Sequence, residues 1–253
     1  MRRCSVLLAL LGSLVLSMGA ADADSDPRAV ALAEAVMERL GGRTAWDTTR
    51  FVRWNFFGKR MHYWDKHTGD VRIEIPERRS EDGKTERPEL FVLMNVGTRQ
   101  GRVWAAGQPV ADETKLREYL DLAHQVWIND SYWMFMPYKL LDPGVTLRYA
   151  GERKLEDGRG ADVLELTFAA GVGYTPENRY EVFVSRDTGL VEQWAFFAQA
   201  ASAEPQFTMP WAGWRQFGSI WLATDHGQGQ DWSIAVDEGL LRAFFTEGIA
   251  PAR

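Results

Sequence analysis

The chain has 253 residues, and its 29 Lys and Arg against 35 Asp and Glu give a formal net charge of −6 at pH 7. A nucleic-acid-binding protein normally carries a basic patch, so this acidic balance excludes nucleic acid as an expected partner. The one cysteine is Cys4, near the start, which leaves the rest of the chain without a thiol for a disulfide, a zinc site or a nucleophile.

Residues 1–23 have the layout of a secretory signal peptide. The chain begins Met-Arg-Arg, residues 6–18 are largely apolar and uncharged, and small residues follow up to Ala23. We therefore expect cleavage near Ala21 to Ala23 and a periplasmic location. The mature chain, residues 24–253, is expected to form a single domain without a transmembrane segment. A retained N-terminal membrane anchor is the alternative.

The mature chain is expected to begin with a helix. Asp26 is a good N-cap, and Pro27 fits the first helical position. Apolar residues then recur at helical spacing up to a terminating pair of glycines: Val30, Ala33, Met37 and Leu40, followed by Gly41 and Gly42.

Much of the remaining chain alternates apolar and polar residues, which is typical of antiparallel strands with one solvated face. Arg72 and Glu74, for example, are expected on such a solvated face. The apolar members of the clearest segments are Val52, Trp54 and Phe56; Val71, Ile73 and Ile75; Leu164, Leu166 and Phe168; Tyr180, Val182 and Val184; and Trp232, Ile234 and Val236.

Short turn signals separate these segments. The hairpin-like pairs are Thr68-Gly69, Asp82-Gly83, Asp157-Gly158 and Thr188-Gly189. Residues 77–89 are predicted to form a charged, solvated hairpin tip. We count about ten strands, which predicts a mostly β (α+β) fold.

One stretch interrupts the strands with a helical pattern. Asp112 is the expected N-cap of a helix over residues 112–128, whose apolar stripe recurs every three or four residues. Residues 129–131 (Asn-Asp-Ser) are interpreted as a cap before the apolar run 132–136. Because the stripe and the run both need burial, we expect this segment to pack into the concave side of a curved, half-open antiparallel barrel as a helical lid or plug.

Two segments carry a resemblance to a known family. They are residues 127–140 (WINDSYWMFMPYKL) and residues 180–190 (YEVFVSRDTGL). With the leader, the N-terminal helix, the strands and the mid-chain helix in this order, the chain resembles the bacterial lipoprotein-carrier superfamily (the LolA/LolB superfamily). The resemblance implies a half-open barrel closed by mid-chain helices, a lipid or lipoprotein acyl chain as partner, and an arginine that latches the lid. No arginine of this sequence is matched to that role.

Histidines and carboxylates give few signs of catalysis or metal binding. His62, Asp65 and His67 resemble a metal cluster, but on a strand His62 faces away from the other two, so we interpret all three as surface residues. His124 and His226 are candidate general bases, yet the sequence has no G-x-S-x-G elbow and no phosphate-binding glycine motif. We predict no catalytic residue, metal or cofactor, and keep an envelope hydrolase that uses His124 or His226 as an alternative.

Aromatic residues are the main functional signal, with 11 Trp and 13 Phe in the chain. We predict a periplasmic binding or carrier protein that holds a lipid, an acyl chain or another apolar small molecule in an aromatic-lined cavity under the lid. The predicted ligand-binding residues are Trp54, Trp64, Trp127, Tyr132, Trp133, Phe135, Met136, Trp194, Phe196, Trp214 and Trp221. The alternative is a non-catalytic structural or interaction module of the cell envelope, whose barrel the same side chains fill. The sequence leaves the oligomeric state open.

Overall fold

The structure is a computed structural model that describes residues 24–227, 229, 232–236 and 243–247. The expected signal peptide, residues 1–23, lies outside the described residues. Within the described part of the chain, no helix is both long enough and apolar enough to span a membrane. The helical elements are α1 (Pro27–Arg39), α2 (Gly42–Thr48), α3 (Glu113–Phe135), the 3-10 turn η1 (Met136–Tyr138) and α4 (Ala243–Thr246).

Two antiparallel sheets make up most of the molecule, and two short hairpins stand apart from them. The upper sheet, in the order β16-β1-β2-β3-β6-β7-β8, consists of β16 (Ala235–Val236), β1 (Phe51–Phe56), β2 (Arg60–Asp65), β3 (Asp70–Ile75), β6 (Leu90–Asn95), β7 (Gly101–Ala105) and β8 (Gln108–Pro109). The lower sheet, in the order β13-β12-β11-β10-β9, consists of β13 (Phe207–Pro210), β12 (Val191–Phe197), β11 (Arg179–Ser185), β10 (Gly160–Phe168) and β9 (Val145–Lys154). The hairpins are β4 (Arg78–Arg79) with β5 (Thr85–Arg87), and β14 (Arg215–Phe217) with β15 (Ile220–Leu222).

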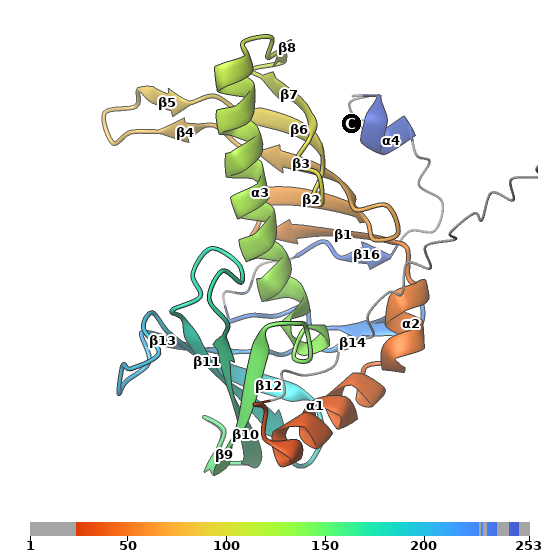
Figure 1. Cartoon of the computed structure of the whole chain (residues 1–253), viewed down its shortest axis with the longest axis vertical. Coiled ribbons are helices and arrows are strands. Elements are labelled where there is room, and N and C mark those ends of the chain that lie inside the picture. Colours follow the sequence, from red (N-terminus) through yellow and green to blue (C-terminus); the bar gives the residue numbers. More distant parts are fainter. Residues whose placement is uncertain (1–23, 228, 230–231, 237–242, 248–253) are drawn as a thin grey trace, which may run out of the picture.

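The sheets lie one above the other along the long axis of the molecule, and α3 runs past both of them (Figure 1). Helix α1 packs beside the lower sheet, where the backbone nitrogen of Asp26 donates to the carbonyl of Leu147 at 2.8 Å. The sheets are not closed into a barrel, which confirms the predicted mostly β, antiparallel and half-open class. The described residues form sixteen strands rather than about ten, because several strands have only two or three residues.

The strands form where the sequence alternates. In β1 the side chains of Val52, Trp54 and Phe56 are buried in the core, as predicted. The four predicted turn glycines all have a positive φ, as at Gly158 between β9 and β10, where φ is 88°. Residues 77–89 contain the exposed β4–β5 hairpin, which projects from the upper sheet (Figure 1).

The outer face of the upper sheet departs from the predicted pattern at Arg72. This side chain was expected in solvent, but it is fully buried. Its guanidinium carbon lies 4.4 Å from the ring centroids of both Phe91 and Phe244, and Nη2 donates to Glu74 at 2.8 Å. Helix α4 supplies Phe244 from the far end of the chain, and cation–π attraction favours this packing. The sequence of β3 alone cannot show that Phe244 of α4 covers Arg72.

The N-terminal helix forms as predicted and is followed by a second helix that was not predicted. The Asp26 side chain caps α1 by accepting from the backbone nitrogen of Arg28 at 2.8 Å. At the glycine pair, Gly41 has a φ of 114°, and a Cβ there would lie 2.4 Å from the carbonyl oxygen of Ser219. Only glycine fits this close approach. The chain then turns into α2, which buries Trp46 against the core.

Helix α3 is one continuous helix of 23 residues. Asp112 is its N-cap, as predicted, and accepts from the backbone nitrogen of Lys115 at 2.8 Å. The predicted end of the helix near residue 128 is wrong, and so is the predicted cap at residues 129–131, because these residues lie inside the helix. The Asp130 carboxylate does not cap a helix. It is fully buried against β2.

Two hydrophobic clusters hold the sheets and α3 together. One cluster joins both sheets, α1, α2 and residues 132–135 in the lower half of α3 (residues 127–135), and it contains the fully buried Trp54 and Trp194. The other packs the upper half of α3 (residues 113–126) on the upper sheet, for example through Leu120. Helix α3 is therefore shared between the two sheets.

Candidate ligand-binding site

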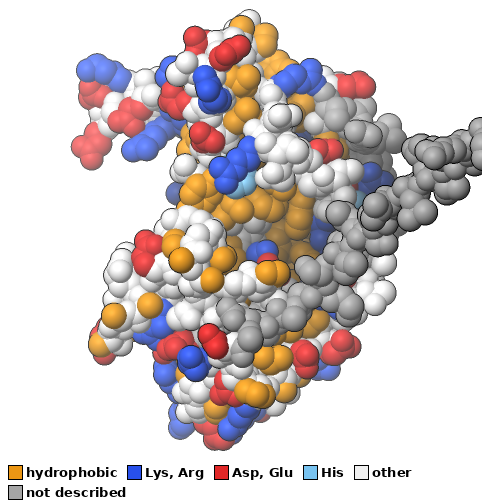
Figure 2. All heavy atoms as spheres, in the orientation of Figure 1, with side chains coloured by type: hydrophobic (Ala, Val, Ile, Leu, Met, Phe, Trp, Pro, Cys, Tyr) orange, Lys and Arg blue, Asp and Glu red, His pale blue; other side chains and the backbone are white. Residues whose placement is uncertain are grey.

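A pocket with a volume of about 280 Å³ lies where the lower half of α3 passes the lower sheet. Helix α3 forms one wall. The other walls come from residues 139–145 after η1, from the adjoining ends of β10 and β11, and from the loop of residues 169–178 between those two strands. Figure 2 shows hydrophobic side chains gathered between the upper and lower parts of the molecule, where the surface is hollowed. The volume is near the lower limit of ligand pockets, about 300 Å³.

Aromatic side chains form much of the pocket wall. Helix α3 contributes Trp127, Tyr132 and Trp133, and the lower sheet contributes Phe168 and Tyr180. The ring centroid of Tyr132 lies 5.9 Å from that of Phe168 and 5.5 Å from that of Tyr180. Such tilted and edge-to-face contacts add about 0.5–1.5 kcal/mol each beyond the burial of the rings. They join α3 to the lower sheet at the back of the pocket.

The eleven residues predicted to bind a ligand fall into three groups. Those that line this pocket are Trp127, Tyr132 and Trp133. Those that fill the core and are at most 1% exposed are Trp54, Phe135, Met136 and Trp194. Those that are half-buried against the same core, outside the described lining of the pocket, are Trp64, Phe196, Trp214 and Trp221. Sequence reasoning missed Phe168, Tyr174 and Tyr180, although the pairing of β10 with β11 across one loop was an available signal.

The lining has no uncompensated charge among the described residues. Its two charged side chains, Lys139 and Asp142, form an ion pair with each other, and each is about one-third exposed at the rim. Burial raises the pKa of the Tyr132 hydroxyl well above its ordinary value, so this group stays neutral. Asn129 and Ser131 add neutral polar groups. The pocket therefore disfavours an ion, because burying an unpaired charge is very costly.

Several buried donors lie in the pocket wall and in the core behind it without an acceptor. The indole nitrogens that have no hydrogen-bond partner among the described residues belong to Trp54, Trp64, Trp127, Trp194 and Trp211. The hydroxyl of Tyr132 is also buried without a described partner. An unpaired buried donor costs about 1–3 kcal/mol. A molecule that brought an oxygen acceptor beside one of these donors would relieve that cost.

Helix α3 is fastened to the upper sheet by a buried ion pair. Arg60 on β2 donates from Nε and Nη2 to the two carboxylate oxygens of Asp130, at 2.7 and 2.8 Å. His62, also on β2, contacts Asp130 Oδ2 through Nε2 at 2.7 Å. Asp130 is fully buried and the Arg60 side chain is only 24% exposed, so water screens the pair weakly. We name Arg60, His62 and Asp130 the α3 clamp.

The burial of the α3 clamp determines its protonation. Desolvation alone would raise the pKa of Asp130, but the bonds from His62 and Arg60 lower it overall. Desolvation lowers the pKa of His62, so the ring is neutral at pH 7 and Nε2 donates its proton to the carboxylate. The clamp supplies an arginine that holds α3, which the sequence could not identify because 70 positions separate Arg60 from Asp130.

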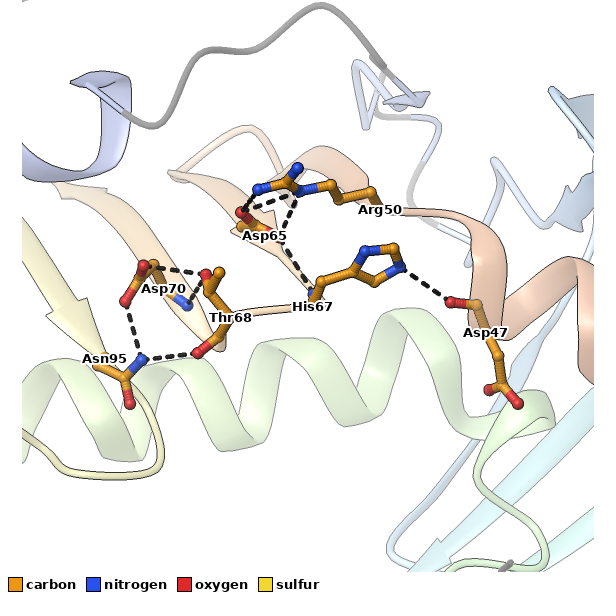
Figure 3. A network of polar contacts seen from close by, with 7 residues as sticks. All are labelled: Asp47, Arg50, Asp65, His67, Thr68, Asp70 and Asn95. Carbon is orange, nitrogen blue, oxygen red and sulfur yellow. Dashed lines mark hydrogen bonds and ion pairs between the residues drawn. The ribbon is translucent and has the colours of Figure 1, made fainter. Parts of the chain in front are cut away.

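The residues considered as a metal cluster have separate partners. The prediction that all three are surface residues is wrong for His62 and Asp65, which are at most 1% exposed. Figure 3 shows that Asp65 accepts from Arg50 and from the backbone nitrogen of His67, whose ring lies 3.1 Å from the carbonyl of Asp47. Among the residues that the structure describes, no group of three or more His, Cys, Asp or Glu side chains could hold a metal ion.

The two candidate general bases have aromatic side chains as their main neighbours in the described chain. Nδ1 of His124 lies 2.6 Å from the hydroxyl of Tyr174. His226 is buried between the rings of Trp211 and Trp232, at centroid distances of 4.5 and 4.2 Å, and burial lowers its pKa to about 3. Neither histidine is hydrogen-bonded to a carboxylate in the described residues, so the hydrolase alternative has no assembled catalytic group there.

Comparison with known proteins finds similarity at the level of the fold. No protein-family model matches the chain, and no curated protein matches it. A putative outer membrane lipoprotein-sorting protein domain from Vibrio parahaemolyticus is 9% identical, with 85% of this chain and 96% of that chain covered and a TM-score of 0.38. A LolA superfamily protein from Nitrosomonas europaea is 13% identical, with 85% and 97% covered and a TM-score of 0.40. Both structures bear names from the lipoprotein-carrier superfamily that the sequence was predicted to resemble, and the similarity concerns the fold alone.

A third similar structure is the Pseudomonas aeruginosa MucA/MucB complex. The identity is 20%, 65% of this chain and 50% of that chain are covered, and the TM-score is 0.23. This chain therefore spans about half of the matched chain. The pocket and the α3 clamp are defined by the geometry of this chain alone.

Proposed function

We propose that this protein is a periplasmic binding or carrier protein for a lipid or similar apolar ligand, and that the pocket beside α3 holds one acyl chain. The observation that carries the proposal is the aromatic-lined space of about 280 Å³ between the lower half of α3 and the lower sheet. In this proposal residues 24–253 act as one exported domain, and residues 1–23 are its leader.

The part of the ligand inside the pocket is uncharged. Lys139 and Asp142 neutralise each other, so a carboxylate or ammonium in the pocket would find no free counter-ion among the described lining residues. The cost of burying an unpaired ion exceeds the gain of about 0.8 kcal/mol per buried methylene. An ester, amide or alcohol instead brings an oxygen acceptor to a pocket wall with two buried donors that have no described partner, the indole nitrogen of Trp127 and the hydroxyl of Tyr132.

The size of the pocket favours one chain. Drug-sized ligands occupy pockets of about 300–1,000 Å³, and this pocket falls just below that range. A single-chain neutral lipid, or one chain of a larger molecule, is therefore the ligand class that we propose.

A filled interaction module is the second candidate. The observation that favours it is the burial of Trp54, Phe135, Met136 and Trp194, which fill the core where they were predicted to line a cavity. In that case the aromatic residues stabilise the fold, and the pocket beside α3 binds no lipid.

Lipid binding separates the two candidates. The purified protein is titrated with monodecanoylglycerol, which is uncharged, and with decanoate at pH 8, and tryptophan fluorescence and calorimetry report binding. We expect saturable binding of one monodecanoylglycerol per chain and at least tenfold weaker binding of decanoate. Native mass spectrometry of the protein from a cell envelope should show a single-chain lipid. Failure of both probes and lipid-free mass spectra would favour the interaction module.

Two tryptophan variants localise the binding. Trp133→Ala removes a pocket wall and should weaken monodecanoylglycerol binding about tenfold or more, as expected for a buried aromatic anchor. Trp104→Ala is the matched control, because Trp104 lies on the outer face of the upper sheet with its ring 5.2 Å from Phe91. Equal losses in both variants would place the lipid elsewhere.

A further inference from the structure

The pocket has two walls that could move to admit a ligand, and the first is α3. This helix is held by the α3 clamp, in which Asp130 is fully buried and bound through both oxygens. Its last turn carries Met134 and Phe135, each 1% exposed. To displace α3, the protein would have to break a buried ion pair and expose core side chains at the same time.

The second wall is the loop of residues 169–178 between β10 and β11, which is held far more weakly. Most of its residues are exposed, and the side chain of Tyr174 is 44% exposed although it lines the pocket. Gly171 and Gly173 have φ values of 81° and 67°, and a Cβ added at either would meet no atom within 4 Å. Backbone hydrogen bonds hold both ends of the loop, from Ala169 to Gly144 and from Ala200 to Glu177, and the exposed residues around Tyr174 have little packing to lose when they move.

One described hydrogen bond ties this loop to α3. The hydroxyl of Tyr174 lies 2.6 Å from Nδ1 of His124, and the two rings meet at 68°. His124 belongs to the upper half of α3, which packs on the upper sheet, so the bond reaches across the mouth of the pocket from the lower sheet. Figure 1 shows the loop that joins β10 to β11 rising beside the middle of α3.

We propose that the loop of residues 169–178 is the entrance of the pocket, and that the hydrogen bond between Tyr174 and His124 closes it while α3 stays in place. This inference rests on the proposed function of the pocket. Opening at Tyr174 exchanges one partly buried hydrogen bond for bonds to water, whereas the route past α3 would break the α3 clamp. Tyr174 therefore sets the rate at which a ligand enters and leaves, and has little effect on affinity.

Exchange kinetics test the entrance. Tyr174→Phe removes the hydroxyl and keeps the ring, and Tyr149→Phe is the matched control, because it removes a hydroxyl bonded to Asp162 outside the pocket. Stopped-flow fluorescence with monodecanoylglycerol should show both rate constants raised about 2- to 10-fold in Tyr174→Phe, the range expected for one hydrogen bond. The dissociation constant should stay within twofold, and the control should behave as the wild type. If Asp130→Asn, still folded, accelerates exchange more than Tyr174→Phe, α3 is the moving wall and the proposal is overturned.

Amide hydrogen exchange of the ligand-free protein gives a readout without lipid. Residues 169–178 should exchange at least 100-fold faster than the helix core of α3, and Tyr174→Phe should accelerate the loop alone. If Tyr174→Phe left the exchange of the loop unchanged, or accelerated the exchange of α3 as well, the proposal that the loop is the entrance would be overturned even if lipids bind. If the loop responds but no probe binds, the proposed function fails, and the role of the loop as an entrance fails with it.

Discussion

The two halves of α3 lie against the two sheets in different ways. The upper half packs Leu120 and Ala123 against aliphatic residues of the upper sheet such as Val71 and Val92. In the lower half, Tyr132 and Trp133 present their rings to the lower sheet beside the pocket. Asp130 and Phe135 of the same half contact the upper sheet. Small aliphatic side chains interdigitate closely, whereas large flat rings meet by their edges. The comparison teaches that one helix can act as core at one end and as the wall of a binding site at the other.

The largest expected effect comes from the α3 clamp, which ties the lower half of α3 to the upper sheet. Asp130→Ala leaves Arg60 and His62 without their partner and should lower the free energy of unfolding by about 3–5 kcal/mol. Asp142→Ala removes one member of a pair that is one-third exposed, so it should cost no more than about 1 kcal/mol. Urea denaturation of both variants measures the difference. Equal costs would mean that the clamp does not fasten α3.

Truncating a side chain in the upper half of α3 should mainly lower stability, whereas truncating one in the lower half should mainly weaken lipid binding. Leu120→Ala should lower the free energy of unfolding by about 2–5 kcal/mol without changing lipid affinity, because Leu120 is a buried core residue. Trp133→Ala should lower the free energy of unfolding by less than truncation of a fully buried tryptophan would, because Trp133 is only half-buried. It should, however, weaken lipid binding. Thermal melts alongside lipid titrations give both quantities. If folded Leu120→Ala protein bound the lipid more weakly than the wild type, the two halves of α3 would not differ in function.

The same comparison shows what the sequence could predict. The Asp26 and Asp112 caps, the turn glycines and strands such as β1 were predicted correctly because each depends on residues within one turn or one strand. The solvated face predicted for β11 was wrong, because Glu181 and Ser185 are buried there. The cap at residues 129–131 and the solvated Arg72 were wrong because their partners come from distant segments. Local pattern cannot reveal such pairings.

The candidate site was only partly predictable for a similar reason. Trp127 stood out in the predicted helical stripe, and Tyr132 and Trp133 in the apolar run that follows it, and all three line the pocket. Tyr174 belongs to an exposed loop, and its place in the site follows from its bond to α3, 50 positions away. Aromatic composition identified the kind of surface, and only the packing decided which rings became core.

Acid should destabilise the aromatic interior behind the lower half of α3. Burial lowers the pKa of His226 to about 3, against about 6.5 in an unfolded chain. Below about pH 6.5, His226 therefore binds a proton in the unfolded chain but stays neutral in the folded chain until the pH approaches 3. This contribution to stability is complete above about pH 6.5, declines as the pH falls toward 3, and amounts to a loss of about 2 kcal/mol between pH 7 and pH 5. The measurement is urea denaturation at both pH values.

A variant isolates the contribution of His226. His226→Phe keeps a ring between Trp211 and Trp232 but removes the titrating group. Its loss of stability between pH 7 and pH 5 should be smaller than that of the wild type by about 2 kcal/mol. The neutral His62 of the α3 clamp shifts in the same direction, so some acid sensitivity should remain. An unchanged loss in the variant would show that His226 does not titrate as described.

The smallest expected effect concerns the charge at the rim of the pocket. Asp142→Asn leaves Lys139 without its carboxylate and gives the lining a net positive charge. Decanoate should then gain up to about fivefold in affinity relative to monodecanoylglycerol, which corresponds to about 1 kcal/mol at a site that is one-third exposed. Competition titrations at pH 8 measure the ratio. A preference unchanged from the wild type would mean that the charged end of the ligand does not reach this rim.

The most direct test of the central claim is the position of a bound chain relative to α3. The protein is loaded with monodecanoylglycerol labelled with ¹³C along its acyl chain, and nuclear Overhauser effects are measured between the chain and assigned aromatic rings. The account predicts contacts with Tyr132 and Trp133 on α3 and with Tyr180 on the lower sheet. Contacts with Trp104 on the outer face of the upper sheet, without any to these three rings, would contradict it.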